Sequence, residues 1–152
     1  MSIAIPPTVS AYSTGLDVSE RQVAELFPAI DPEFEPFGAR VLVQLRRVVN
    51  KSAGGIILAE PTKDTEAWNI NVAKVLRSGP LAFKRRDDPD TPWPEGVWAK
   101  EGDFVMVPRY GGDRRSIDLN DGLPPVVIVL LDDRNLLGRI TGNPCKIRAY
   151  IA

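Results

Sequence analysis

Apolar and polar residues alternate over short stretches of this 152-residue chain, and turn residues separate one stretch from the next. Val41, Val43 and Leu45 fall on one face of a predicted strand, while Gln44 and Arg46 mark the other, which predicts a half-buried strand. Alternating or continuous apolar patterns, bounded by glycine and proline, predict further short strands at residues 69–76, 104–107, 114–119, 125–131, 136–140 and 145–151. Many short strands joined by tight turns are typical of a small β-barrel.

One stretch near the N-terminus follows the period of an α-helix instead. In residues 17–27, Val18, Val23, Leu26 and Phe27 fall roughly on one face, and prolines after position 27 end the helix. The apolar face of this helix needs a partner, which is either the rest of the subunit or another protein. The predicted fold class is therefore mainly β: a small irregular β-barrel that carries an N-terminal helical extension.

The most unusual stretch is residues 51–58, where small residues precede a run of large aliphatic ones. Gly54 and Gly55 give the backbone unusual freedom, and Ile56, Ile57 and Leu58 follow them directly. Charged and polar residues then return the chain to water. Two interpretations fit this pattern: a hydrophobic anchor on a glycine hinge, or a hairpin turn that feeds a buried strand. Spacing alone favours the strand.

Residues 81–100 form a polar stretch with mixed charge and several prolines, which predicts a solvated loop or the tip of a long hairpin. Trp93 and Trp98 are expected to pin its base, since a large ring buries much apolar area for little entropy. The basic triplet at residues 84–86 is followed by acidic residues that cancel its field. A solvated face is therefore a better interpretation of the triplet than a nucleic-acid site.

Composition narrows the function mainly by what the chain lacks. The chain has no histidine and one cysteine, Cys145, so Ser-His and Cys-His nucleophile pairs, the usual zinc sites and an intrachain disulfide are excluded. A net charge of −1 argues against nucleic acid as the default partner, and no apolar run is long enough to span a membrane. The carboxylate pairs Asp87/Asp88 and Asp132/Asp133 lie in polar, turn-like contexts and are expected to be solvated surface. We expect no enzymatic activity, no metal and no cofactor.

Several segments carry a common resemblance. Residues 35–43 combine a proline and an arginine with alternating aliphatics, and residues 51–58 combine the glycine pair with the aliphatic tripeptide. The other segments that carry it are residues 100–105, 110–111 and 132–137. Together they resemble the small co-chaperonins of the GroES-like family, with residues 51–58 similar to its mobile loop almost residue for residue. Such a divergent member is consistent with a phage-encoded version.

The resemblance implies three regions. Residues 1–34 form an N-terminal arm with a short helix, and residues 141–152 form a C-terminal tail or edge strand. Residues 35–140 form the GroES-like barrel, with a mobile loop at about 49–68 and a roof hairpin at about 79–101. The N-terminal helix, the long 81–100 stretch and the C-terminal tail are departures from the family pattern.

The same resemblance implies a function. Members of this family form a homo-oligomeric ring, sevenfold in the family, which caps the cylinder of a GroEL-like chaperonin and encloses unfolded substrate proteins. On this basis the chaperonin-binding residues are Gly54, Gly55, Ile56, Ile57 and Leu58. The chaperonin, not this chain, binds and hydrolyses ATP, and the protein works in the cytoplasm, which is the host cytoplasm if a phage encodes it.

Three alternatives stay open. The chain is alternatively a structural or virion assembly protein that uses a GroES-like barrel, with the loop packed in an interface. A nucleic-acid binder on a small barrel would require a basic, aromatic-lined face. An enzyme on a related barrel would require a catalytic constellation, and the sequence contains none that we can identify.

Overall fold

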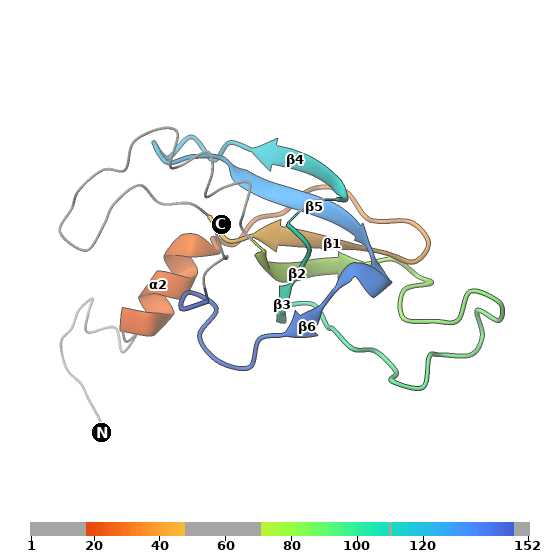
Figure 1. Ribbon diagram of the computed structural model, residues 1–152. Coiled ribbons are helices and arrows are strands. Elements are labelled where there is room, and N and C mark those ends of the chain that lie inside the picture. Colours follow the sequence, from red (N-terminus) through yellow and green to blue (C-terminus); the bar gives the residue numbers. More distant parts are fainter. Residues whose placement is uncertain (1–17, 48–70, 110, 148–152) are drawn as a thin grey trace, which may run out of the picture.

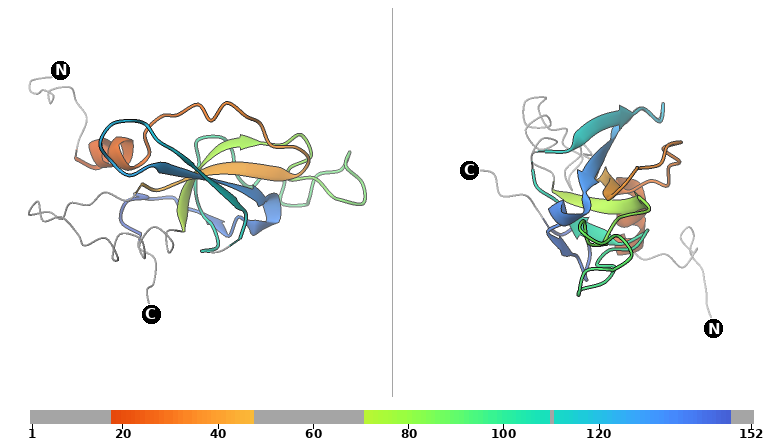
Figure 2. Two further views of the ribbon diagram at one scale, coloured as in Figure 1. Left: turned by 90° about the horizontal axis from the view of Figure 1, so that it is seen from above. Right: turned by 90° about the vertical axis from the view of Figure 1, so that its right-hand side faces the viewer.

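A computed structural model describes residues 18–47, 71–109 and 111–147. Over these residues, six antiparallel strands form one sheet in the order β4-β5-β1-β2-β3-β6 (Figure 1). The strands are β1 (Arg40–Leu45), β2 (Val72–Ser78), β3 (Phe104–Met106), β4 (Asp113–Ile117), β5 (Val126–Asp132) and β6 (Gly138–Arg139). The helical elements are α2 (Val18–Leu26) and a 3₁₀ turn, η1 (Asp133–Asn135). Viewed from one end, the strands follow an arc (Figure 2), and the prediction of a mainly β fold with an N-terminal helix is confirmed.

The strand β1 lies inside the sheet and pairs on both sides. Val43 is opposite Val75 of β2 on one side and Val129 of β5 on the other. All three side chains are buried in the main core, where apolar area is removed from water. The other buried members of this core are Val41, Leu45, Ala73, Ala82, Phe83, Ala99, Val105, Val107, Leu131 and Leu136.

The opposite face of β1 is also buried, so the prediction of a half-buried strand is wrong. Gln44, expected on a solvated face, has an exposed fraction of 0%. The segment between α2 and β1 runs back along this face (Figure 2), and the Gln44 side-chain amide donates to the Pro28 carbonyl at 2.9 Å. Farther along the segment, Arg77 of β2 donates to Asp31 at 3.2 Å. The segment that covers this face of β1 has irregular structure. Irregular structure has no hydrophobic periodicity, so the sequence pattern does not predict this cover.

The helix α2 ends before Pro28, as its sequence predicts, and its C-terminal end contacts its own subunit. Phe27 is 3% exposed, and its ring meets the Phe104 ring edge-on with 4.9 Å between centroids. The Phe27 N–H donates to the Val23 carbonyl at 2.8 Å and closes the last turn. The helix is therefore attached to β3 through its C-terminal end.

The turn after β2 requires a glycine. The Gly79 N–H donates to the Arg40 carbonyl at 2.8 Å, which brings two backbones together at the start of β1. A Cβ atom at position 79 would lie 2.3 Å from the Gly38 carbonyl oxygen, a contact that no side chain can make without a backbone shift. This close approach fixes where the 81–100 stretch leaves the sheet.

The C-terminal part departs from the prediction. The strand expected at residues 136–140 is reduced to β6, two residues that pair with β3. The alternation that begins at Cys145 does not form a strand in residues 143–147, which make a turn instead. The Cys145 N–H donates to Asn143 Oδ1 at 2.8 Å, and this local hydrogen bond competes with strand pairing.

Candidate functional site

The residues expected to bind a partner, Gly54, Gly55, Ile56, Ile57 and Leu58, lie outside the described residues. These residues belong to the segment 48–70, and the structure describes the chain on either side of it. Leu45 of β1 pairs with Ala73 of β2, and the Arg46 N–H donates to the Val72 carbonyl at 2.9 Å. The chain therefore leaves the sheet and returns to it on neighbouring strands. We call Arg46 and Arg47 the loop root.

Arg47 is a buried cation held by several acceptors. Its side chain is 2% exposed, and its guanidinium donates to both carboxylate oxygens of Asp121 at 2.7 and 2.8 Å. Its Nε donates to the Pro124 carbonyl at 2.9 Å, and its backbone N–H donates to the Leu26 carbonyl at 2.8 Å. A bidentate arginine–carboxylate pair fixes orientation as well as distance.

The Asp121 carboxylate is placed by the loop between β4 and β5. It also accepts from the Leu123 N–H at 3.2 Å. The hydrogen bond from Arg47 lowers the pKa of Asp121 below its ordinary value of 3.8, because it favours the charged carboxylate. At neutral pH this carboxylate is therefore charged and binds the arginine.

Arg46 is buried on the side of the C-terminal tail. The residue is 8% exposed, and its guanidinium donates to the Pro144 carbonyl at 2.8 Å and to the Ile147 carbonyl. Nearby, burial raises the pKa of the Cys145 thiol, which keeps it protonated and a poor nucleophile at neutral pH. The loop root is thus held by α2, the 118–124 loop and the tail together.

A second cluster attaches the 81–100 stretch to the sheet. Asp133 is fully buried, and its carboxylate accepts from the Phe83 N–H at 2.6 Å and from the Arg86 guanidinium. The hydrogen bond to this carboxylate raises the pKa of Arg86. The Asp133 carbonyl accepts from the Trp98 indole N–H at 3.2 Å, and the Trp98 ring packs edge-on against Phe83 at 4.8 Å. Trp98 therefore pins the base of the stretch as predicted.

The expectation that Asp132 and Asp133 are solvated is wrong for Asp133. Asp132 is exposed, whereas Asp133 turns inward at the start of η1 and meets residues 83 and 86. Asp87 and Asp88 are both exposed, as expected. Sequence inspection also missed Arg46 and Arg47; the available signal was that each of these polar residues directly follows an apolar strand.

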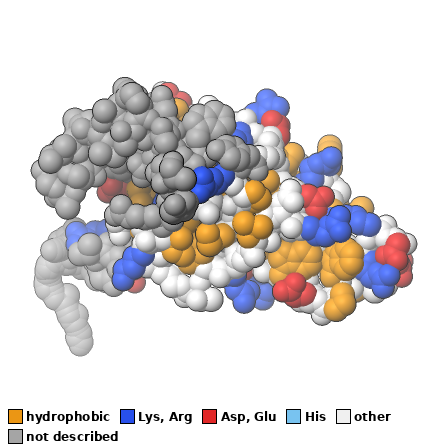
Figure 3. Space-filling view, in the orientation of Figure 1, with side chains coloured by type: hydrophobic (Ala, Val, Ile, Leu, Met, Phe, Trp, Pro, Cys, Tyr) orange, Lys and Arg blue, Asp and Glu red, His pale blue; other side chains and the backbone are white. Residues whose placement is uncertain are grey.

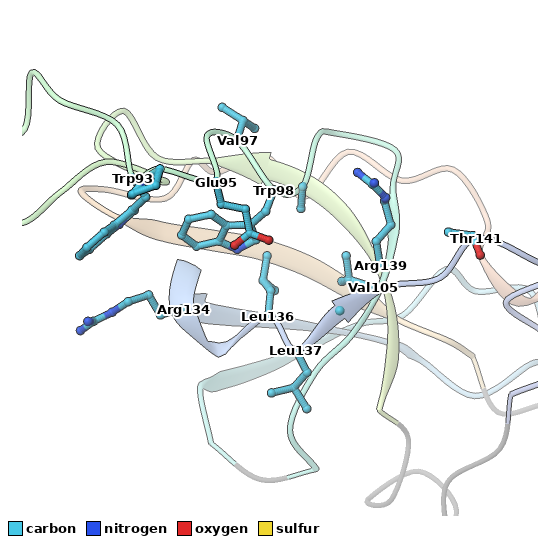
Figure 4. Close-up of a pocket in the computed structure, with 13 residues that line it drawn as sticks. Trp93, Glu95, Val97, Trp98, Val105, Arg134, Leu136, Leu137, Arg139 and Thr141 are labelled. Carbon is cyan, nitrogen blue, oxygen red and sulfur yellow. The ribbon is translucent and has the colours of Figure 1, made fainter.

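A groove of about 880 Å³ lies between the 81–100 stretch and β6 (Figure 4). Trp98 and Leu136 lie in its middle, Trp93 and Arg134 at one end, and Arg139 towards the other. The Arg134 guanidinium lies over the Trp93 ring, 6.0 Å from its centroid. Apolar and basic side chains also lie close together on this side of the molecule in the space-filling view (Figure 3). The groove offers apolar contact beside two arginines, Arg134 and Arg139, and one acidic residue, Glu95.

These features provide contact surfaces. Within the described ranges, no three His, Cys, Asp or Glu side chains lie close enough together to bind a metal ion. In the same part of the chain, no helix has the length and apolar character needed to cross a membrane.

Comparisons with known proteins give a consistent result. The family model described as "Chaperonin 10 Kd subunit" matches residues 33–140. A curated relative, Co-chaperonin GroES from Methylacidiphilum infernorum, is 32% identical over 89 residues, which are 59% of this chain and 81% of the relative. Another Co-chaperonin GroES, from Rubrobacter xylanophilus, is 28% identical over 106 residues, which are 70% of this chain and 94% of the relative. The family match includes all six strands but neither α2 nor residues 141–147.

Proposed function

The chain belongs to the chaperonin 10 kDa subunit family and is a co-chaperonin, and from this premise we propose that it forms a ring that caps a GroEL-like chaperonin. The observation that carries the proposal is the family match over residues 33–140, which spans the sheet and the segment 48–70. In this role the protein encloses unfolded substrate proteins in the chaperonin cavity. It performs no reaction of its own and needs no cofactor, because the chaperonin hydrolyses ATP.

The proposed chaperonin-binding residues are Gly54, Gly55, Ile56, Ile57 and Leu58. Burying the three aliphatic side chains would contribute roughly 5–9 kcal/mol at about 1.5–3 kcal/mol each. Ordering about eight residues around them would cost roughly 8–16 kcal/mol at about 1–2 kcal/mol each. One copy would therefore bind weakly. In a ring, docking of one copy raises the effective concentration of the others, so binding becomes strong but remains reversible.

The described surface supports assembly with further copies of the chain. Phe37 is 80% exposed and Phe34 is 39% exposed, and Phe34 lies between Glu33 and Glu35 in the segment before β1. The groove between the 81–100 stretch and β6 presents apolar side chains beside Arg134 and Arg139, with Glu95 also in its lining, so it can receive both the phenylalanines and the acidic residues of that segment. A contact between two different patches generates a ring if its rotation closes. We propose a heptamer, as in the family, located in the cytoplasm.

The proposed binding residues are tested by Ile57→Asp. This charge should abolish capping of a GroEL-type chaperonin, because the apolar groove that receives the tripeptide cannot solvate a carboxylate. Thr65→Asp is the matched control, since it adds the same charge to the same segment outside the tripeptide. Capping is measured by co-sedimentation with chaperonin and nucleotide, and native mass spectrometry checks that both variants assemble. Capping by Ile57→Asp at wild-type concentrations would exclude this docking mode.

The alternative of a structural or virion assembly protein is not favoured, because the family and both relatives are co-chaperonins. Native mass spectrometry of the wild type with and without chaperonin separates the two. A complex with chaperonin that forms only in the presence of nucleotide supports the capping function. Assembly of the protein that does not change when chaperonin is added opposes it.

A further inference from the structure

The loop root is held partly by segments that lie outside the family match. The Arg47 N–H donates to the Leu26 carbonyl at the end of α2, and Arg46 donates to carbonyls of Pro144 and Ile147 in the tail. The match covers residues 33–140, so α2 and these tail residues are additions to the family domain. Both additions therefore meet at the point where the chain enters residues 48–70.

The remaining support comes from the 118–124 loop between β4 and β5. Asp121 holds the Arg47 guanidinium with two hydrogen bonds of 2.7 and 2.8 Å, and the Pro124 carbonyl accepts from Arg47 Nε at 2.9 Å. This arrangement uses three donors of one planar group, so the side chain has little rotational freedom left. Asp121 itself is 37% exposed, so its replacement leaves no buried cavity.

Two adjacent buried guanidinium groups are a costly way to stabilise a fold. Moving a charged group out of water costs free energy, and good hydrogen-bond geometry at most offsets that cost. A protein with apolar side chains at such positions is often at least as stable. What such groups do provide is a single allowed geometry, since each must reach its acceptors. The loop root therefore fixes the direction of the backbone as it leaves β1.

We propose that Arg46 and Arg47 are positioning residues for chaperonin docking: braced by α2, Asp121 and the tail, they hold the entry to residues 48–70 in one direction. This inference rests on the proposed function, because it assigns the loop root a role in the same binding event. A fixed root leaves fewer residues to be ordered when the aliphatic tripeptide docks. If releasing the loop root means that one more residue must be ordered in each copy, the affinity of each docking step falls about five- to thirtyfold.

The test compares two aspartate-to-asparagine substitutions that break an arginine–aspartate pair. Asp121→Asn removes the carboxylate charge that Arg47 requires. Asp113→Asn is the matched control, since Asp113 pairs with Arg115 at 3.0 Å on the exposed strand β4, away from the root. Asp121→Asn should raise the chaperonin-docking half-saturation concentration at least tenfold and speed hydrogen exchange in peptides that cover residues 46–58. Asp113→Asn should change neither.

A general loss of stability is separated from loss of positioning by a third variant, Asp133→Ala, which weakens the fold at the 81–100 stretch. At a temperature where all proteins stay assembled, only Asp121→Asn should weaken docking. The proposal is overturned if Asp121→Asn behaves like Asp113→Asn in both assays, or if docking by all variants simply follows their melting temperatures. If the wild type fails to bind chaperonin, the proposed function fails, whereas the exchange comparison still decides whether Asp121 constrains the root.

Discussion

Replacing Asp133 with alanine tests whether the buried carboxylate holds the 81–100 stretch onto the sheet. Asp133 has no exposed surface, and its carboxylate accepts from the Phe83 N–H at 2.6 Å and from Arg86. Alanine leaves the Phe83 N–H buried without that acceptor. The Arg86 side chain is 36% exposed and lies 3.1 Å from Asp132, so it can turn to another acceptor and to water.

The expected cost follows from these contacts. Leaving the Phe83 N–H buried without its acceptor costs about 1–3 kcal/mol. The ion pair adds little because Arg86 is partly solvated. We therefore expect the free energy of unfolding to fall by about 1–3 kcal/mol, a substantial part of the roughly 5–15 kcal/mol that is typical of a folded protein.

The assay is urea unfolding followed by tryptophan fluorescence, since the Trp98 indole donates to the Asp133 carbonyl. Protomer concentrations must be matched, because assembly contributes to apparent stability. Asp87→Ala is the control: it removes an exposed pair with Arg85 in the same stretch and should leave the midpoint unchanged. A fall below about 1 kcal/mol for Asp133→Ala would refute the reasoning, because it would mean that water replaces the carboxylate without penalty.

Two further predictions concern the loop root and the assembly. The pKa of Asp121 is lowered in the folded protein, so the stability from its pair with Arg47 is present above the ordinary value of 3.8 and is lost as the pH falls through the lowered value. Once corrected for the intrinsic pH dependence of amide exchange, hydrogen exchange near residue 47 should be constant from pH 5 to 8 and should rise only in stronger acid. Phe37→Ser should leave the protomer folded, because the side chain is 80% exposed, but shift native mass spectra from ring to monomer; an intact ring would exclude Phe37 from the contact.

The strands could be predicted because their pattern is local. Val41, Val43 and Leu45 alternate, and the apolar run that forms β5 fits its buried position inside the sheet. The burial of Gln44 could not be predicted, since its cover is the Pro28 segment sixteen positions earlier. Alternation also failed at residues 145–147, where the Cys145 N–H donates to the Asn143 side chain and the chain makes a turn instead.

The polar contacts were hidden for a different reason. Arg47 meets Asp121 across 74 positions, and Arg86 meets Asp133 across 47. Nothing near Asp132 and Asp133 in the sequence says which of the two turns inward. The residues proposed to bind chaperonin were identified by their resemblance to a family motif, and they stay a prediction because they lie outside the described residues.

Both long excursions from the sheet begin beside a buried charge. A long loop costs little more closure entropy than a short one, so length alone does not stop an excursion from taking many directions. A buried charge does, because it has hydrogen-bond partners in only one place: Asp133 serves the 81–100 stretch and Arg47 serves residues 48–70. The two ion pairs differ in the exposed fraction of the carboxylate side chain, which is 0% for Asp133 and 37% for Asp121. Loss of Asp133 should therefore lower the stability of the protomer, while loss of Asp121 should leave a folded ring whose binding segments no longer enter in one direction.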